Sequence, residues 1–155
     1  MPDAKVSPKL PDWIKDHVQR YRASNGADGH MMSFPSNPAG PVPTLLLTTT
    51  GRRSGERFVF PLIYGRTGTG GYVVIASKGG APEHPGWYRN LVAHPAVEVQ
   101  VASQTFRATA RTATGAERTR LWGEMAALFA PYNDYQKKAG GREIPVVVLE
   151  PQAGG

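Results

Sequence analysis

The chain has no cysteine, which excludes disulfides, thiolate metal ligands and thiol nucleophiles. Its four histidines, His17, His30, His84 and His94, do not have the spacing of metal ligands, so we expect no metal site. The carboxylates are scattered, with no pair suited to glycoside hydrolysis, and no Gly-x-Ser-x-Gly elbow is present. A chain without an evident reactive side chain suits cofactor chemistry, in which the protein binds, orients and shields the molecule that transfers the electrons.

Long apolar runs are also missing. No segment approaches the roughly 18 uninterrupted apolar residues of a membrane span, and the opening sequence MPDAKVSPKLPDW has no apolar signal-peptide core. We therefore expect a cytoplasmic protein. The 155 residues are enough for one ordinary hydrophobic core, and the 18 glycines and 14 prolines indicate many turns between short elements.

Positive charge exceeds negative charge by 6 over the whole chain, and most of the excess lies between Thr44 and Arg111. The charged side chains of that region give it a net charge of +5: Arg52, Arg53, Arg57, Arg66, Lys78, Arg89, Arg107 and Arg111, against Glu56, Glu83 and Glu98. Such a surplus suits nucleic acid, an anionic membrane surface or a small polyanionic ligand, and charge alone does not choose among them.

Near residue 44 the chain changes from a Gly- and Pro-rich segment to short runs of residues that favour strands. We expect residues 1–43 to form a head, with one helix and a Gly- and Pro-rich loop, and residues 44–155 to form the cofactor-binding domain. The helix is predicted over residues 11–22, where apolar side chains recur at helical spacing. These side chains are Trp13, Ile14, His17, Val18 and Tyr21.

Short β-rich runs follow, separated by turn residues. They cover residues 44–49, 58–64, 72–77, 97–102, 105–112 and 144–149. Two helices interrupt them, one over residues 85–92 and one that opens at the capping-box pattern Thr114-x-x-Glu117 and runs to about Ala130. Six short strands with these insertions predict a small, mostly antiparallel barrel and not a doubly wound parallel sheet.

The string TTTGRRSGER follows the first expected strand. Gly51 and Gly55 permit tight backbone geometry and close approach of a ligand. Arg52, Arg53 and Arg57 supply forked donors that suit carboxylate and phosphate groups. The spacing is not that of a Walker A loop. Taken alone, the string is also typical of an exposed hairpin turn with solvated arginines.

Two later segments also place polar or aromatic groups after strands. In VVIASKGG, Ser77 and Lys78 end a strand, and the glycines after them can expose backbone amides to an anion or a ring oxygen. In HPGWYRNL, Trp87 and Tyr88 present flat surfaces near a helix N-terminus, which favours an anion. Taken alone, the first string is more typical of a polar exit turn, and Trp87 could also be an ordinary core residue.

Hydroxyl groups are the remaining candidates for supplying a proton. They are Ser77 and the two tyrosines of FAPYNDYQKK, Tyr132 and Tyr135. The tyrosines are three residues apart on an expected helix, so they could instead cover the core.

Taken together, several segments resemble the deazaflavin-dependent nitroreductase family of actinobacteria: LTTTGRRSG, Pro61 six residues after Gly55, VVIASKGG, HPGWYRNL, HPAVEVQV, PYNDYQ and IPVVVLEP. The likeness covers residues 42–151 in order, and the joint occurrence is more specific than any single segment. The family consists of α+β split β-barrels, similar to flavin reductases and FMN-binding proteins. The resemblance therefore implies a split barrel of about six mostly antiparallel strands, with coenzyme F420 as cofactor and FMN as the alternative.

The resemblance also implies roles for individual residues. The loop that binds the phosphate and acidic tail would be Arg52, Arg53 and Ser54, and the strand that lines the ring site would be Phe58, Val59, Phe60, Pro61, Leu62 and Ile63. The end of the next strand would contact the cofactor through Ala76, Ser77 and Lys78. The helix that completes the cofactor wall would contribute Gly86, Trp87, Tyr88 and Asn90. Tyr132 and Tyr135 would border the acceptor, and with Ser77 they are the candidate catalytic residues. Related chains often carry an Arg where this chain has Phe58, so we expect its grip on the tail to differ.

The implied activity is the transfer of a hydride from reduced F420 to a small-molecule acceptor: a quinone, a nitro compound or an activated C=C bond. The N-terminal helix would cover the acceptor pocket, contact the inner face of the cell membrane to reach a lipophilic quinone, or pack on the barrel. Both a monomer and a homodimer are compatible with a split barrel. The alternatives are an FMN- or haem-binding split barrel and a non-catalytic F420-binding protein. A nucleic-acid-binding barrel is disfavoured, because its aromatics should alternate with basic residues along exposed strands.

Overall fold

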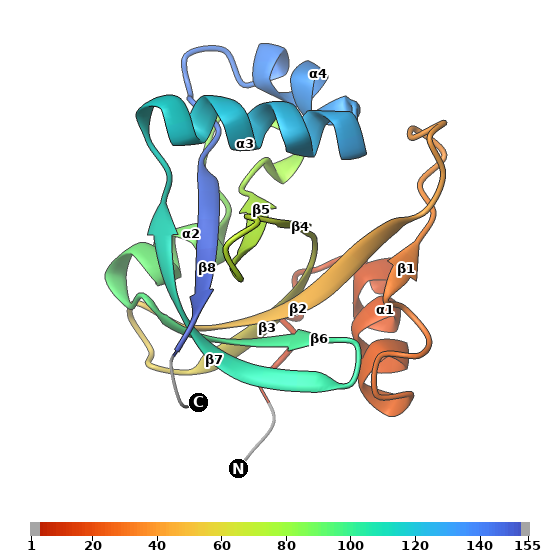
Figure 1. The fold of residues 1–155 in the computed structure, drawn as a ribbon. Helices are drawn as coiled ribbons and strands as arrows, with labels where there is room; N and C mark the ends of the chain where they lie inside the picture. The colour runs from red at the N-terminus through yellow and green to blue at the C-terminus, as the bar shows by residue number, and fades with distance from the viewer. Residues whose placement is uncertain (1–3, 153–155) are drawn as a thin grey trace.

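The computed structural model describes residues 4–152, and eight of its strands form one curled, open sheet (Figure 1). Seven strands follow the order β1-β2-β6-β7-β8-β5-β4, and β3 pairs with β2. The strands are β1 (Met31–Met32), β2 (Val42–Thr50), β3 (Arg57–Ile63), β4 (Gly65–Arg66), β5 (Tyr72–Ile75), β6 (Ala96–Val101), β7 (Gln104–Thr112) and β8 (Val146–Pro151). All of these pairs are antiparallel. The predicted split barrel is confirmed, and the two-residue strands β1 and β4 add to the six expected strands.

Four α-helices and one short 3-10 turn cover parts of this sheet. They are α1 (Asp12–Ala23), η1 (Lys78–Gly80), α2 (Gly86–Ala93), α3 (Gly115–Leu128) and α4 (Pro131–Lys138). The prediction of helices near residues 11–22, 85–92 and 114–130 is confirmed. The third helix ends at Leu128, and a new helix begins at Pro131, where a residue without an N–H is tolerated in the first turn.

The predicted capping box at the start of α3 is wrong in its contacts. Thr114 is the N-cap residue, but its side chain makes no capping hydrogen bond. The Glu117 carboxylate instead accepts from both terminal nitrogens of Arg111 on β7, at 2.6 and 2.8 Å. A bidentate arginine competes successfully with a backbone N–H for the carboxylate, because the ion pair adds charge to two hydrogen bonds.

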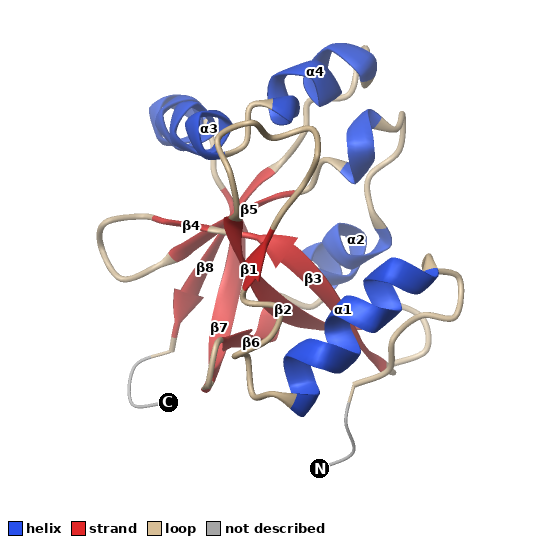
Figure 2. Ribbon diagram, turned by 90° about the vertical axis from the view of Figure 1, so that its right-hand side faces the viewer, coloured by secondary structure: helices blue, strands red, loops and turns tan. Residues whose placement is uncertain are grey.

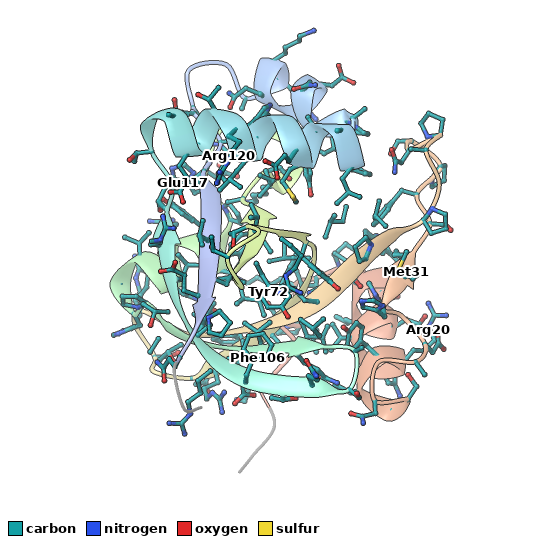
Figure 3. The ribbon with its side chains drawn as sticks, in the orientation of Figure 1. Arg20, Met31, Tyr72, Phe106, Glu117 and Arg120 are labelled. Carbon is teal, nitrogen blue, oxygen red and sulfur yellow. The ribbon has the colours of Figure 1, made fainter. Side chains whose placement is uncertain are left out.

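The core has three parts. One fills the inside of the barrel, where the Tyr72 and Phe106 rings stack at 5.4 Å within the curve of the sheet (Figure 3). A second lies beneath α3 and α4 and includes the buried Leu121 and Met125 of α3. The third joins α1 to the outer face of β2 and β3. Within residues 4–152, β3 pairs with β2 on one side and has only an isolated bridge between Lys5 and Phe58 on the other, and the site lies along this edge.

The head is held to the barrel through α1. Val18 and Tyr21 are fully buried against Leu46 and Val59 of the sheet. The Tyr21 hydroxyl donates to the Thr44 carbonyl at 2.9 Å and accepts from the Ala102 amide at 2.8 Å. In the described part of the chain, no helix combines the length and apolar character needed to cross a bilayer.

Candidate active site

The helices α1, α2 and α4 lie on the same side of the molecule as β3 (Figure 2). A cavity of about 990 Å³ opens along β3 and is lined by residues of these three helices. Its walls are mostly apolar, and the cationic residues Lys9, Arg52 and Lys78 are part of the lining. Most of the residues selected from the sequence line it: Arg52, Phe58, Val59, Phe60, Pro61, Leu62, Ile63, Ser77, Lys78, Gly86, Trp87, Asn90, Tyr132 and Tyr135. Segments far apart in the chain therefore meet at one hollow that is large enough for a ring-bearing ligand.

Four of the selected residues do not line the cavity. Arg53 and Ser54 lie on the exposed turn after β2, next to lining residue Arg52. Ala76 is fully buried in the barrel core. The Tyr88 hydroxyl is hydrogen-bonded to the Thr112 hydroxyl at 2.9 Å, and its ring packs 5.0 Å from that of His84. The wall that α2 gives to the cavity thus consists of the residues on either side of Tyr88.

β3 is the edge of the sheet at this cavity. Among the described residues 4–152, its outward-facing backbone is paired only near one end. There the Lys5 amide donates to the Arg57 carbonyl and the Val59 amide donates to the Lys5 carbonyl, both at 2.9 Å. Because backbone groups alternate sides along a strand, Pro61 also faces this edge. A proline has no N–H to leave unpaired, so its position favours an open edge. The local sequence thus keeps this part of the sheet available to a ligand.

The turn between β2 and β3 is closed by backbone hydrogen bonds from Gly51 to Glu56 and from Gly55 to Gly51. At its base, the Arg52 amide and guanidinium both donate to Oδ1 of Asn90, at 3.2 and 2.9 Å. Asn90 is buried on α2 and holds Arg52 against the cavity mouth. The turn and α2 are therefore connected through one side chain.

Across residues 4–152, no carboxylate forms an ion pair with Arg52 or Arg53. Arg57, by contrast, pairs with Glu98 at 3.3 Å and lies outside the cavity lining. The sequence grouped these three arginines, and the alternation of side chains along β3 separates the third from the other two.

The SKGG segment leaves β5 in a left-handed turn. Lys78, Gly79 and Gly80 have φ angles of 47, 61 and 83°. A Cβ on Gly80 would lie 2.7 Å from the Tyr135 carbonyl oxygen, so the turn packs closely on α4. The Lys78 ammonium forms an exposed ion pair with Glu83 at 3.0 Å. Close approach to α4 explains why this position requires glycine.

Tyr132 and Tyr135 lie on α4 where it borders the cavity. Tyr132 is only 4% exposed, and its ring packs 5.0 Å from Phe129 and 6.3 Å from Tyr135. Burial raises the pKa of the Tyr132 hydroxyl, and the neighbouring Tyr135 raises it further. The phenol therefore stays protonated at physiological pH and is a hydrogen-bond donor.

Several lining residues were not selected from the sequence as site residues. They include Leu10, Trp13, Ile14 and His17 of the head, with Phe34, Thr49 and Phe129. The apolar stripe of the N-terminal helix did indicate pocket covering as one role, but Phe34 lies in a loop without periodicity. Trp13 is 54% exposed, so the head forms a partial wall and not a complete lid.

Comparisons with known proteins agree with one another. A family model described as F420H(2)-dependent quinone reductase matches residues 13–151. A protein of Mycobacterium tuberculosis (strain ATCC 25618 / H37Rv), named as an F420H(2)-dependent quinone reductase, is 40% identical over 139 residues, which are 88% of this chain and 88% of the relative. A solved F420-H2 dependent reductase, FDR-A, is 41% identical with a TM-score of 0.63, covering 70% of this chain and 94% of that one. Another solved structure, described as a domain-swapped dimer, is 36% identical with a TM-score of 0.65, covering 93% of this chain and 100% of that one.

Proposed function

The chain belongs to the F420H(2)-dependent quinone reductase family, whose cofactor is coenzyme F420, and from this we propose that it reduces a quinone in the cavity along β3. The observation that supports this most is the meeting of an unpaired arginine turn, an apolar ring-sized hollow and two bordering tyrosines at one place. The family match confirms the initial resemblance to an F420-dependent family, for both the family and the cofactor.

The residues present fit this cofactor. F420 has a flat deazaflavin ring, a phosphodiester and a polyglutamate tail, and the two uncompensated guanidinium groups suit its anionic part. A Cβ added at Gly55 or Gly86 would meet no atom within 4 Å, so the backbone is open beside the turn and at the start of α2. We assign Arg52, Arg53 and Ser54 to the anionic tail.

The ring would lie against the open edge of β3 and the wall that α2 provides. Phe58, Phe60 and Leu62 alternate along one face of this strand, and Trp87 stands across from it in the lining. These apolar surfaces would hold a planar group and exclude water from it. We assign Ser77 and Lys78, at the end of β5, to polar contacts with the ring or its side chain.

When bound in reduced form, F420 supplies a hydride. The chain's own contribution on the acceptor side would come from α4. The protonated Tyr132 hydroxyl would donate a hydrogen bond to the acceptor oxygen, and Tyr135 would help to position the acceptor. Because the raised pKa makes Tyr132 a weak acid, we propose that solvent supplies the proton that the acceptor takes up after hydride transfer. Ser77 is the other candidate hydroxyl in the lining.

The proposal is tested by following the oxidation of reduced F420 by the purified full-length protein with a short-chain quinone, a nitroaromatic compound and an activated enone. We expect quinone-dependent turnover with the highest kcat/KM among the three acceptors. Turnover with the nitro or enone compound alone would reject the quinone assignment while keeping the cofactor, and the absence of turnover with all three would reject the proposed reaction.

A further inference from the structure

The side chain of Arg142 holds together the strand end and the loop that form one end of the cavity. Arg142 lies between α4 and β8 and is partly buried. Its guanidinium donates to three carbonyl oxygens: Nη2 to Ser77 at 2.7 Å, Nε to Ala81 at 2.9 Å and Nη1 to Ala76 at 3.1 Å. Nη1 also donates to Nδ1 of His84 at 3.0 Å. No other side chain in residues 4–152 makes as many hydrogen bonds to this loop.

The backbone at this point needs such a partner. The β5–β8 ladder continues to the bond from the Ala76 amide to the Pro145 carbonyl, and the chain then turns away through the left-handed residues of η1. The carbonyl of the buried Ala76 lies opposite Pro145, which has no N–H to donate, so it needs another donor. The Ser77 carbonyl accepts from the Gly80 amide at 2.9 Å in addition to its bond from Arg142. A planar guanidinium can bond several carbonyl groups at once because its donors are fixed in a fork.

The backbone of Arg142 is in turn fixed to α4. The side-chain amide of Gln136 donates to the Arg142 carbonyl at 2.8 Å, and its oxygen accepts from the Ile144 amide at 2.9 Å. Gln136 directly follows Tyr135 on α4. The backbone of Arg142 is thus connected to the helix that carries the acceptor tyrosines, and its guanidinium is bonded to the turn that carries Ser77 and Lys78.

The same guanidinium also reaches the segment that leads into α2. His84 accepts at Nδ1, and the helix that contains Trp87 and Asn90 begins two residues later. Burial lowers the pKa of His84, and the positive charges of Arg142 and Arg89 lower it further, so the ring is neutral and can accept. The contact extends the influence of Arg142 from one wall of the cavity to the next.

We propose that Arg142 is a positioning residue that sets the spacing between the Ser77–Gly80 turn, the start of α2 and the tyrosines of α4. The inference rests on the proposed function, because the reaction it serves is hydride transfer between a cofactor on one side and an acceptor on the other. It differs from an ordinary structural arginine in joining three separate walls of the same cavity. Misplacement of the reacting groups by about 1 Å can lower turnover about 100-fold.

The test compares Arg142→Gln with Arg118→Gln. Arg118 is a matched control, because its guanidinium donates to the Ile144 carbonyl at 2.8 Å in the same connection but makes no bond to residues 76–84. We expect Arg142→Gln to lower kcat roughly 10- to 100-fold and to weaken F420 binding, with a smaller change in the KM for the quinone. Arg118→Gln should lower thermal stability without lowering kcat or weakening F420 binding in this way. Equal kinetic losses in the two variants, or none in Arg142→Gln, would overturn the proposal.

A measurement on the cofactor-free protein separates this inference from the proposed function. In Arg142→Gln, amide hydrogen exchange should accelerate at residues 77–84, and the pKa of His84, followed by NMR, should rise because one lowering charge is gone. Neither change is expected in Arg118→Gln. Unchanged exchange and an unchanged His84 titration would reject the positioning role even if the wild type binds F420. If Arg142→Gln does not fold, Arg142→Lys, which keeps the charge but loses the fork, is measured for exchange and kinetics.

Discussion

Arg52 and Arg53 are expected to supply most of the electrostatic attraction for an anionic cofactor. Each can form charge-assisted hydrogen bonds, which contribute about 1.5–3 kcal/mol apiece, and neither is neutralised by a carboxylate in residues 4–152. We therefore predict that Arg52→Ala with Arg53→Ala raises the F420 dissociation constant by at least about 100-fold. Fluorescence quenching of F420 measures it.

The control for that change removes the same charge elsewhere. Arg107→Ala with Arg120→Ala takes two exposed arginines from β7 and α3, outside the cavity lining. A general loss of positive charge should weaken binding only slightly. If both double variants weaken F420 binding equally, the arginine turn is not the tail site.

Tyr132 is predicted to act after the cofactor is bound. Tyr132→Phe should leave the F420 dissociation constant within about twofold and lower kcat roughly 100-fold, as removal of a preorganised donor at a developing negative charge does. Steady-state kinetics with a quinone check it. Tyr64→Phe is the matched loss of a phenol hydroxyl, since Tyr64 is bonded to His30 outside the lining. Unaltered turnover in Tyr132→Phe would remove the donor role.

Tyr21 leads to a prediction about stability at high pH. Burial raises the pKa of Tyr21 from 10.0 to about 12 in the folded protein, so the folded state keeps a proton that the unfolded chain loses. This contribution to stability is present below pH 10 and is lost as the pH rises toward 12. At about 1.4 kcal/mol per pKa unit, the rise from 10.0 to about 12 corresponds to about 3 kcal/mol. Urea unfolding should show a steeper alkaline loss for wild type than for Tyr21→Phe; parallel slopes would contradict the assignment.

The turn η1 contains two glycines that the structure distinguishes. Gly79 has a φ of 61° and open space around its Cβ position, whereas Gly80 has a φ of 83° and would place a Cβ 2.7 Å from the Tyr135 carbonyl. We predict that Gly79→Ala costs about 1 kcal/mol of unfolding free energy. Gly80→Ala should cost roughly 1–3 kcal/mol more, because the added Cβ would overlap with the backbone of α4. Denaturant titration gives both values. Equal costs would show that α4 does not depend on this contact.

The elements themselves were largely predictable, because short β-rich runs between glycines and prolines define strands and spaced apolar residues define helices. Strands β2, β3, β6 and β7 lie within two residues of their expected bounds at each end. The false capping box shows where local patterns fail. Glu117 is three residues after Thr114, but its partner Arg111 lies on a strand that the pattern did not consider.

The site was predictable only where the residues form local strings. GRRSG, SKGG and HPGW each predict a turn or the start of a helix, and one or more residues of each string line the same cavity. Arg142 gave no such signal, because its partners are more than fifty residues away and it stands alone between glycines and IPVVVL. Phe34 packs against Phe129 and Thr49 accepts a hydrogen bond from Asn90, and a single sequence does not show such contacts between distant segments.

The whole molecule combines a barrel with a head that is anchored at one end of α1 and borders the cavity at the other. Val18 and Tyr21 are buried, while Trp13 and Ile14 face the hollow. We propose that residues 4–43 act as an acceptor-side wall and not as an independent part. The excess positive charge of the whole molecule then adds a long-range attraction for an anionic cofactor, which salt screens over a Debye length of about 8–10 Å.

The most direct measurement is a titration of the full-length protein with oxidised F420 by fluorescence quenching, with FMN titrated in parallel at low and at high salt. We predict tight binding of F420, weak binding of FMN, and an F420 affinity that falls as salt rises, because the arginine turn faces solvent. Preference for FMN, binding of neither molecule, or F420 binding that does not respond to salt would contradict the assignment of the arginine turn and the cavity along β3 to this cofactor.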